Sequence, residues 1–197
     1  MSAETKAQLR SEMIARRDAL PRAERGRIAE ALTQNLTALP QYTAARSVLA
    51  TMSIGSEWTT RAFLDRAQAD GKVIVLPRLS APPRRLEIHS VADMERGLVP
   101  GVWDIPEPDP QRNPRVQLTD VDFAVVPALA VDRFGYRLGY GAGYFDGLLA
   151  GRGLRPFCVT ALPAAFVVEQ VPREPHDVAV DFLVCELGPV AMKTARP

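Results

Sequence analysis

The sequence is poor in cysteine and histidine, with two residues of each among 197. Cys158 and Cys185 lie in separate apolar runs, no C-x-x-C pair is present, and only His89 and His176 could complete a set of nitrogen and sulfur ligands. A structural zinc cluster is therefore not expected. We expect both cysteines to be small core residues in a reducing compartment, and His89 to be structural.

Net charge and long apolar runs are also missing. The 24 Lys and Arg residues nearly balance the 23 Asp and Glu residues, so nothing draws the whole chain to nucleic acid. The longest strongly apolar stretch, Phe123–Val131, is shorter than the ~20 residues of a membrane helix, and Met1–Met13 is too polar for a signal peptide. We predict a cytoplasmic monomer or weak homo-oligomer that binds small molecules, no nucleic acid and no membrane.

What the sequence does contain is a hydrophobic pattern that alternates between strand and helix periods. It predicts helices over Ala3–Ala19, from Pro21 to Pro40, from Thr59 or Thr60 to Gly71, and from Tyr144 onward. Short apolar runs predict strands at Ser47–Ser53, Val73–Leu76, Leu86–His89, Asp122–Pro127, Phe157–Leu162 and Phe182–Cys185. Five prolines make residues 97–118 a long loop or lid. The alternation indicates one α/β domain over residues 1–197, with a layered, mostly parallel sheet.

The most informative segment is Arg137-Leu138-Gly139-Tyr140-Gly141-Ala142-Gly143-Tyr144-Phe145-Asp146. It follows a predicted strand and opens a predicted helix, and its glycines let successive backbone N–H groups face an anion, typically phosphate. The segment is neither a Walker A loop nor a G-x-G-x-x-G dinucleotide motif. The alternative is a tight glycine turn without a ligand.

Two carboxylates are candidate metal ligands. Asp146 ends the glycine segment, and a carboxylate beside phosphate is tolerated when Mg²⁺ lies between them. Asp177, in the segment Pro175–Val178, is the second candidate. The alternative for Asp146 is a favourable charge at a helix N-terminus. His176 is a candidate base, although a lone histidine in a loop is more often structural or solvated.

Basic residues follow one face of the first predicted helix. Lys6 and Arg10 are four residues apart and Arg17 continues their face. These side chains could clamp a polyphosphate, and a solvated basic face is the alternative.

Glu57 lies just past the carboxyl end of the first predicted strand, where open α/β sheets bind ligands. Its carboxylate could accept paired N–H bonds from a pterin or similar ring, with Met52 in apolar contact. Trp103, within the long loop, would cover that ring as part of a lid. The alternatives are an ordinary loop carboxylate and a loop that its own apolar residues pin to the core.

In this order and spacing, these segments resemble the 5-formyltetrahydrofolate cyclo-ligase family over nearly the whole chain. The matching motifs are Lys6-x-x-Leu9-Arg10, Ser56-Glu57-x-x-Thr60, Leu76-Pro77-Arg78, Gly101 through Ile105-Pro106-Glu107-Pro108, Pro127-x-Leu129-Ala130-x-Asp132, the segment from Arg137 to Asp146, and Pro175-His176-Asp177-Val178 with Asp181.

The resemblance implies a three-layer αβα fold related to sugar isomerases and CoA transferases, and an ATP- and Mg²⁺-dependent enzyme. The reaction closes 5-formyltetrahydrofolate into 5,10-methenyltetrahydrofolate: the formyl oxygen attacks the γ-phosphate of ATP and displaces ADP, N10 adds to the activated carbon, and phosphate leaves. It implies Lys6, Arg10 and Arg137 as catalytic residues and Mg²⁺ at Asp146 and Asp177. The folate is implied at Met52, Glu57, Trp103, Tyr140 and Tyr144. ATP is implied at Lys6, Arg10, Arg137, Leu138, Gly139, Tyr140, Gly141, Ala142, Gly143, Tyr144 and Phe145.

Departures from the family pattern are few. Ala142 stands where relatives often have Gly or Lys, Tyr140 replaces an Arg of some relatives, and Phe145 replaces a frequent Tyr. A side chain at Ala142 avoids strain only at negative φ. Two alternatives to the ligase remain: a non-catalytic folate- or nucleotide-binding relative, and a sugar-phosphate isomerase-like enzyme on the same fold, which needs no ATP.

Overall fold

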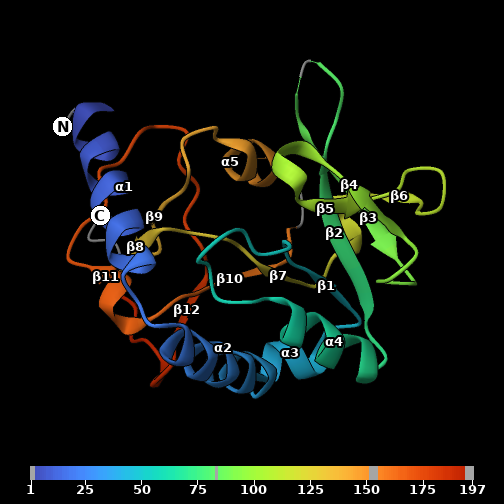
Figure 1. Cartoon of the computed structure of the whole chain (residues 1–197), viewed down its shortest axis with the longest axis horizontal. Coiled ribbons are helices and arrows are strands. Elements are labelled where there is room, and N and C mark those ends of the chain that lie inside the picture. Colours follow the sequence, from blue (N-terminus) through green and yellow to red (C-terminus); the bar gives the residue numbers. More distant parts are fainter. Residues whose placement is uncertain (1–2, 83, 151–154, 194–197) are drawn as a thin grey trace.

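An eight-stranded mixed sheet runs through the centre of the protein, in the order β13-β12-β10-β7-β1-β2-β3-β6 (Figure 1). The computed structural model describes residues 3–82, 84–150 and 155–193. The strands of this sheet are β1 (Ser47–Leu49), β2 (Val73–Leu79), β3 (Leu86–Val91), β6 (Arg115–Val116), β7 (Phe123–Val125), β10 (Phe157–Ala161), β12 (Phe182–Cys185) and β13 (Gly188–Pro189). The central strands, from β12 to β2, pair in parallel, and both edges are antiparallel. The predicted α/β class with a mostly parallel sheet is confirmed.

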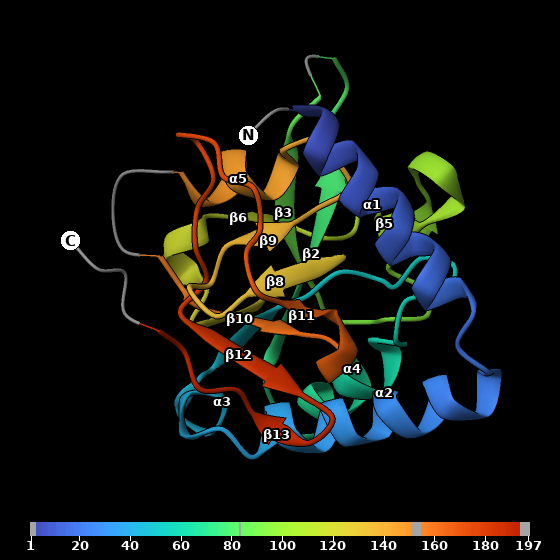
Figure 2. The same ribbon diagram turned by 90° about the vertical axis from the view of Figure 1, so that its left-hand side faces the viewer.

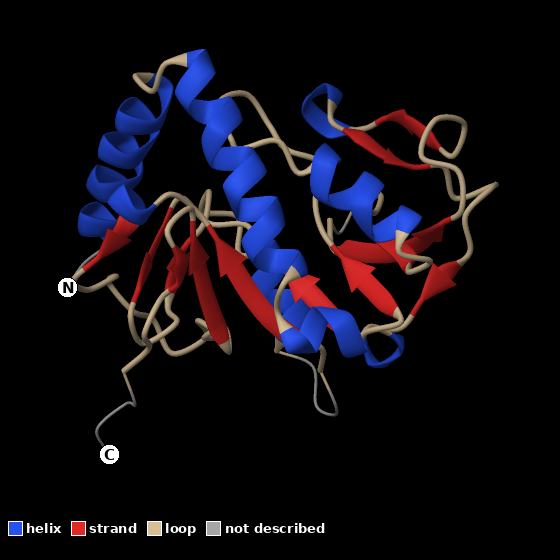
Figure 3. Cartoon of the chain, turned by 90° about the horizontal axis from the view of Figure 1, so that it is seen from below, coloured by secondary structure: helices blue, strands red, loops and turns tan. Residues whose placement is uncertain are grey.

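Helices cover one face of the sheet, and helices with a second, smaller sheet cover the other. Helices α2, α3 and α4 lie on one face, whereas α1, α5 and the sheet β11-β8-β9 lie on the opposite one (Figure 1 and Figure 2). Seen from below, α2 lies in front of the strands of the main sheet (Figure 3). The helices are α1 (Ala3–Asp18), α2 (Arg22–Thr37), α3 (Pro40–Ala44), α4 (Arg61–Ala69) and α5 (Tyr144–Leu149). The small sheet consists of β8 (Ala130–Asp132), β9 (Arg137–Leu138) and β11 (Val167–Val168).

Side-chain alternation along the central strands divides the core into two halves. Val48 of β1 belongs to the cluster that includes Leu32 of α2, whereas its neighbour Leu49 belongs to the cluster on the other face, with Met13 of α1. Both cysteines are free and buried, as predicted. None of the helices in the described ranges has the length and apolar character needed to cross a membrane.

Two prolines do not end the elements that they were predicted to end. Pro40 opens α3 as a first-turn residue, because α2 already ends at Thr37. β2 continues through Pro77 to Leu79. The backbone N–H and C=O groups of Val73 and Val75 point toward β1. Because this direction repeats at every second residue of a strand, the backbone of Pro77 also points to that side, beyond the end of β1. The missing N–H of Pro77 therefore breaks no bond to β3. The strand predicted over Ser47–Ser53 is also shorter, and ends at Leu49.

The proline-rich residues 97–118, predicted as a long loop or lid, contain short strands and 3-10 turns. Strands β4 (Leu98–Pro100) and β5 (Pro106–Pro108) form an antiparallel two-stranded sheet around the 3-10 turn η1 (Val102–Asp104). Such a ribbon accommodates proline because each strand has one unpaired side. Two further 3-10 turns are η2 (Leu118–Asp120) and η3 (Ala164–Phe166). The role of this segment as a lid stays a prediction.

The strand order reverses at β1. The chain continues from β1 to β2 on one side and returns later as β7 on the other. The crevice outside the carboxyl ends of such neighbouring strands is the usual ligand site of open α/β sheets. The loop after β1 carries Glu57, and the chain after β7 leads through β8 and β9 to the glycine turn.

Candidate active site

The glycine turn connects β9 to α5. Gly141 and Gly143 have φ angles of 105° and 66°, in the region that favours glycine. Among the described residues other than glycine, only Asp104 has a positive φ, so Ala142 takes its place in the turn at negative φ. The side chain of Ala142 therefore puts no left-handed strain on this turn.

Basic side chains of α1 reach the turn and form with it a polar pocket of about 140 Å³. We call this the phosphate pocket; Lys6, Arg10, the whole segment Arg137–Asp146, and the acidic segment with Glu174 and Asp177 line it. Arg10 Nε donates to the Gly139 carbonyl at 2.9 Å. All residues predicted at ATP thus lie around one pocket.

Lys6 is a buried cation of the phosphate pocket. Its side chain is 9% exposed, and Nζ donates to Glu174 Oε2 at 2.6 Å and to Asp177 Oδ2 at 2.8 Å. Burial by itself lowers the pKa of Lys6, but the hydrogen bonds and charges of Asp177 and Glu174 outweigh it and raise this pKa above its ordinary value. Burial likewise opposes ionisation of Asp177, yet the bonds from Lys6 and the Glu174 N–H hold the pKa of Asp177 below its ordinary value. The three groups form a fully ionised cluster at neutral pH.

Arg137 and Asp146 form a second ion pair in the same pocket. Arg137 Nη2 donates to Asp146 Oδ1 at 2.8 Å, and the Val178 N–H donates to the same oxygen at 3.1 Å. The Arg137 side chain is 3% exposed, so burial lowers its pKa and the Asp146 charge opposes that change. Asp146 therefore neutralises a buried guanidinium, a role that the sequence did not suggest.

Two carboxylate oxygens of the pocket remain open to a cation. Among the described residues, no hydrogen bond reaches Asp146 Oδ2 or Asp177 Oδ1. Glu174, His176 and Asp177 also place one ligand atom each within 4.8 Å of one another. The His176 side chain is 66% exposed and forms no close hydrogen bond among the described residues. Oxygen donors of this kind suit a hard cation such as Mg²⁺.

An apolar cavity of about 440 Å³ adjoins the phosphate pocket, within the size range of ligand sites. We call it the ring cavity. Met52, Glu57, Tyr140 and Tyr144, four of the five residues predicted at folate, line it. The fifth, Trp103, lies in η1, and its side chain is outside the described part of the structure. Tyr140 and Tyr144 also line the phosphate pocket, so the glycine turn separates the two spaces as a shared wall.

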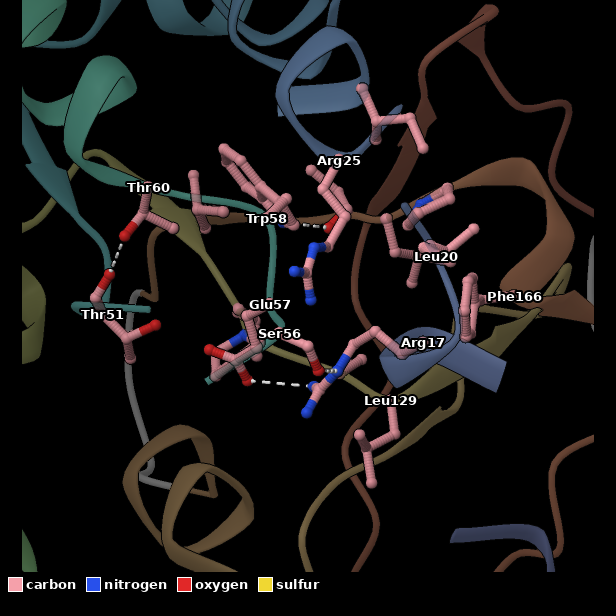
Figure 4. A pocket seen from close by; sticks show the side chains of 18 residues that line it. Arg17, Leu20, Arg25, Thr51, Ser56, Glu57, Trp58, Thr60, Leu129 and Phe166 are labelled. Atoms are coloured by element: carbon pink, nitrogen blue, oxygen red, sulfur yellow. Dashed lines mark hydrogen bonds and ion pairs between the residues drawn. The ribbon is translucent and has the colours of Figure 1, made fainter. Parts of the chain in front are cut away.

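Glu57 is held from several directions. Its Oε2 accepts the Ile54 N–H at 2.8 Å and its Oε1 accepts the Tyr140 hydroxyl. Arg17 Nη1 lies 3.6 Å from Oε1, and Arg17 Nε donates to Ser56 Oγ at 2.8 Å (Figure 4). Arg17 does continue the helix face of Lys6 and Arg10, as predicted, but it reaches Glu57 and does not line the phosphate pocket.

The loop that carries Glu57 is tied to α4 by a threonine. Thr60 Oγ1 donates to the Thr51 carbonyl at 2.6 Å. The sequence predicted Thr59 or Thr60 as a side-chain cap of α4, but no cap hydrogen bond forms from Thr60. The hydroxyl instead closes the loop between β1 and α4 that contains Glu57.

Comparison with known proteins places this geometry in a family. The profile of the 5-formyltetrahydrofolate cyclo-ligase family matches residues 2–186. The chain belongs to this family. A 5-formyltetrahydrofolate cyclo-ligase of Mycolicibacterium smegmatis is 33% identical over 98% of this chain and 100% of its own, and one of Mus musculus is 27% identical over 93% and 94%. The NMR structure of Aquifex aeolicus 5,10-methenyltetrahydrofolate synthetase superposes with a TM-score of 0.84 at 30% identity, covering 98% of this chain and 95% of that one.

The structure of this cyclo-ligase family member adds residues that the sequence analysis missed. Glu174 binds Lys6, and its only signal was its place beside the Pro175–Val178 motif. Leu76, Pro77 and Ile105 line the ring cavity. These three belong to motifs that carried the resemblance, but nothing in their spacing assigned them to a ligand.

Proposed function

We propose that the phosphate pocket binds the phosphates of ATP and the ring cavity binds 5-formyltetrahydrofolate, so that the chain closes this substrate into 5,10-methenyltetrahydrofolate. The activity and the use of ATP follow from membership of the cyclo-ligase family. The assignment of the two spaces is supported by their common wall, since Tyr140, Ala142, Tyr144 and Phe145 line both. A phosphate on one side of this wall and a formyl group on the other would be neighbours, as phosphoryl transfer requires.

The phosphate end supplies positive charge. Arg10 lies against the glycine turn, and Lys6 and Arg137 are buried cations already paired with carboxylates. Positioning and charge neutralisation are the main contributions of a protein to phosphoryl transfer. We expect the incoming triphosphate to share Lys6 with Glu174 and Asp177.

The donor set fits Mg²⁺. Asp146 and Asp177 each keep one oxygen without a hydrogen bond among the described residues, and one or two carboxylates plus phosphate oxygens are its usual ligands. Asp146 and Asp177 would hold the ion, which when bound would neutralise charge on the transferring phosphate. Lys6 and Arg137 remain the nearest protein cations to these two carboxylates.

The ring end supplies shape and one oriented carboxylate. Ile54 and Tyr140 occupy one lone pair on each oxygen of Glu57, and a carboxylate has about four such positions. The remaining pair can accept the adjacent N–H donors of a reduced pterin. The apolar lining from Met52, Leu76 and Ile105 would exclude water from the formyl group while its oxygen attacks the γ-phosphate.

The layered arrangement also supports the proposed relation to sugar isomerases and CoA transferases, but fold alone does not separate those reactions from this one. An isomerase would need neither ATP nor paired metal carboxylates. The non-catalytic alternative rested on Ala142, and the negative φ of Ala142 removes that reason.

The decisive experiment is an assay of the purified protein with 5-formyltetrahydrofolate, with and without ATP and Mg²⁺, following the methenyl chromophore. We expect product only when both are present. Arg10→Gln should raise the KM for ATP about 10- to 100-fold, whereas Arg27→Gln on the outer face of α2 serves as a charge-matched control. Product without ATP, or equal effects of the two variants, would contradict the proposal.

A further inference from the structure

One face of α1 extends from the phosphate pocket to a crevice that shares Glu57 with the ring cavity. Arg17 lies eleven residues beyond Lys6 and seven beyond Arg10, so the three side chains share a face over about 16 Å of helix. Lys6 and Arg10 line the phosphate pocket, whereas Arg17 lines the crevice beside Glu57 (Figure 4). Arg17 therefore lies at the Glu57 end of the site, away from the phosphate pocket.

Arg17 contacts both residues that flank Glu57 in space. Its Nη1 donates to the Tyr140 hydroxyl at 2.6 Å, and its Nε donates to Ser56 Oγ at 2.8 Å. Ser56 Oγ in turn donates to Asp18, the last residue of α1. The side chains of Arg17 and Glu57 are only 15% and 13% exposed, whereas Tyr140, at 46%, lies on the solvent side of these contacts.

The chemistry of the three groups fixes the direction of the hydrogen bonds. A guanidinium can only donate and an ionised carboxylate can only accept. Because Arg17 donates to the oxygen of Tyr140, the single hydroxyl hydrogen of Tyr140 goes to Glu57. Burial and the charge of Glu57 raise the pKa of Tyr140 to about 12, so the phenol keeps this hydrogen at neutral pH.

We infer that Arg17 is a positioning residue for folate binding, which acts through Tyr140 to aim the Glu57 carboxylate into the ring cavity. The inference rests on the proposed contact between Glu57 and the pterin. With Arg17 in place, the Tyr140 hydroxyl has one orientation and Glu57 Oε1 has one fixed donor. Without Arg17, the hydroxyl of Tyr140 is free to rotate, so Glu57 Oε1 no longer has a fixed donor.

Steady-state kinetics of Arg17→Gln test this role. The KM for 5-formyltetrahydrofolate should rise about tenfold, the loss of one charge-assisted bond, while kcat and the KM for ATP change less than about twofold. Arg17→Lys should recover part of the loss, because an ammonium cannot hold both hydroxyls in the fixed fork of a guanidinium. The matched control is Arg16→Gln, since the Arg16 guanidinium lies over the Phe166 ring at 5.7 Å, and it should leave all three constants unchanged.

A double-mutant cycle separates positioning from a general structural role. If Arg17 acts through Tyr140, then Arg17→Gln combined with Tyr140→Phe should raise the KM for the folate no further than Tyr140→Phe alone. Additive increases, or a parallel loss in kcat and in both KM values, would overturn the inference. Glu57→Gln distinguishes failure of the proposed pterin contact from failure of the role of Arg17. If Glu57→Gln leaves the KM for the folate unchanged, the pterin contact is refuted. If Glu57→Gln raises this KM but Arg17→Gln does not, only the role of Arg17 is refuted.

Discussion

Replacing Gly141 with alanine tests whether the glycine turn and Arg10 act as one phosphate-binding unit. A β-carbon at Gly141, at φ 105°, would lie 3.3 Å from Arg10 Cζ and 3.5 Å from Arg10 Nε. The guanidinium must then move by a few tenths of an ångström, although it is bonded to the Gly139 carbonyl at 2.9 Å. Gly143→Ala is the matched control, because Gly143 also has a positive φ, of 66°, but a β-carbon there meets nothing within 4 Å.

The two variants should share a loss of stability but differ in nucleotide binding. Alanine at a positive φ costs about 1–3 kcal/mol, and each kcal/mol lowers the Tm of a chain of this size by about 2–4 °C. Only Gly141→Ala displaces Arg10, and losing one charged contact to phosphate costs about 1.5–3 kcal/mol. That corresponds to a decrease of about 10- to 100-fold in kcat/KM for ATP.

Thermal melts followed by circular dichroism would give the Tm of each variant, and methenyl formation at varied ATP concentration would give its kcat/KM for ATP. We expect both variants to melt several degrees lower, with a large loss of kcat/KM for ATP in Gly141→Ala and a change within about threefold in Gly143→Ala. Equal values of kcat/KM for ATP in the two variants would refute the link between the turn and Arg10.

Three further outcomes are expected. Asp146→Asn should lower turnover about 10²–10³-fold, with a fold that circular dichroism shows to be retained. The Tm should fall, because the buried Arg137 loses its counter-charge. Near-wild-type rates at saturating Mg²⁺ would argue against Asp146 as a ligand. Ala142→Gly should give no gain in kcat/KM for ATP, because Ala142 has a negative φ, and should cost about 0.4–1 kcal/mol through the unfolded state; higher activity would show that the methyl group obstructs phosphate. Since the pKa of Asp177 is depressed in the folded state, its pair with Lys6 stabilises the fold above the ordinary pKa of about 3.9 and is lost as the pH falls through the lower folded value. Urea unfolding should therefore show Asp177→Asn less stable than the wild type at pH 6, with the difference shrinking below about pH 4; a constant difference down to pH 2.5 would contradict this.

The local chemistry of the chain was determined by the sequence. Alternating hydrophobic periods predicted the parallel strands and their helices, because a side chain's face depends only on its spacing along a strand or helix. The glycines at 141 and 143 marked a turn that only glycine forms without strain, and the motif order carried the family. The prediction that Pro77 ends its strand was wrong because the sequence does not show how β2 pairs with its neighbours. The nitrogen of Pro77 points away from β3, so the strand can continue through this proline without losing a hydrogen bond to β3.

Contacts between distant segments were decided by the tertiary structure alone. Lys6 pairs with Glu174 across 168 residues, and Tyr140 bonds to Glu57 across 83. Periodicity placed Arg17 on the same helix face as Lys6 correctly, but it could not show that this face passes from one binding space to another. That outcome depends on how α1 packs on the rest of the fold, with Arg10 at the glycine turn and Arg17 beside Glu57. This placement is set by packing of the whole core and not by any segment of the sequence.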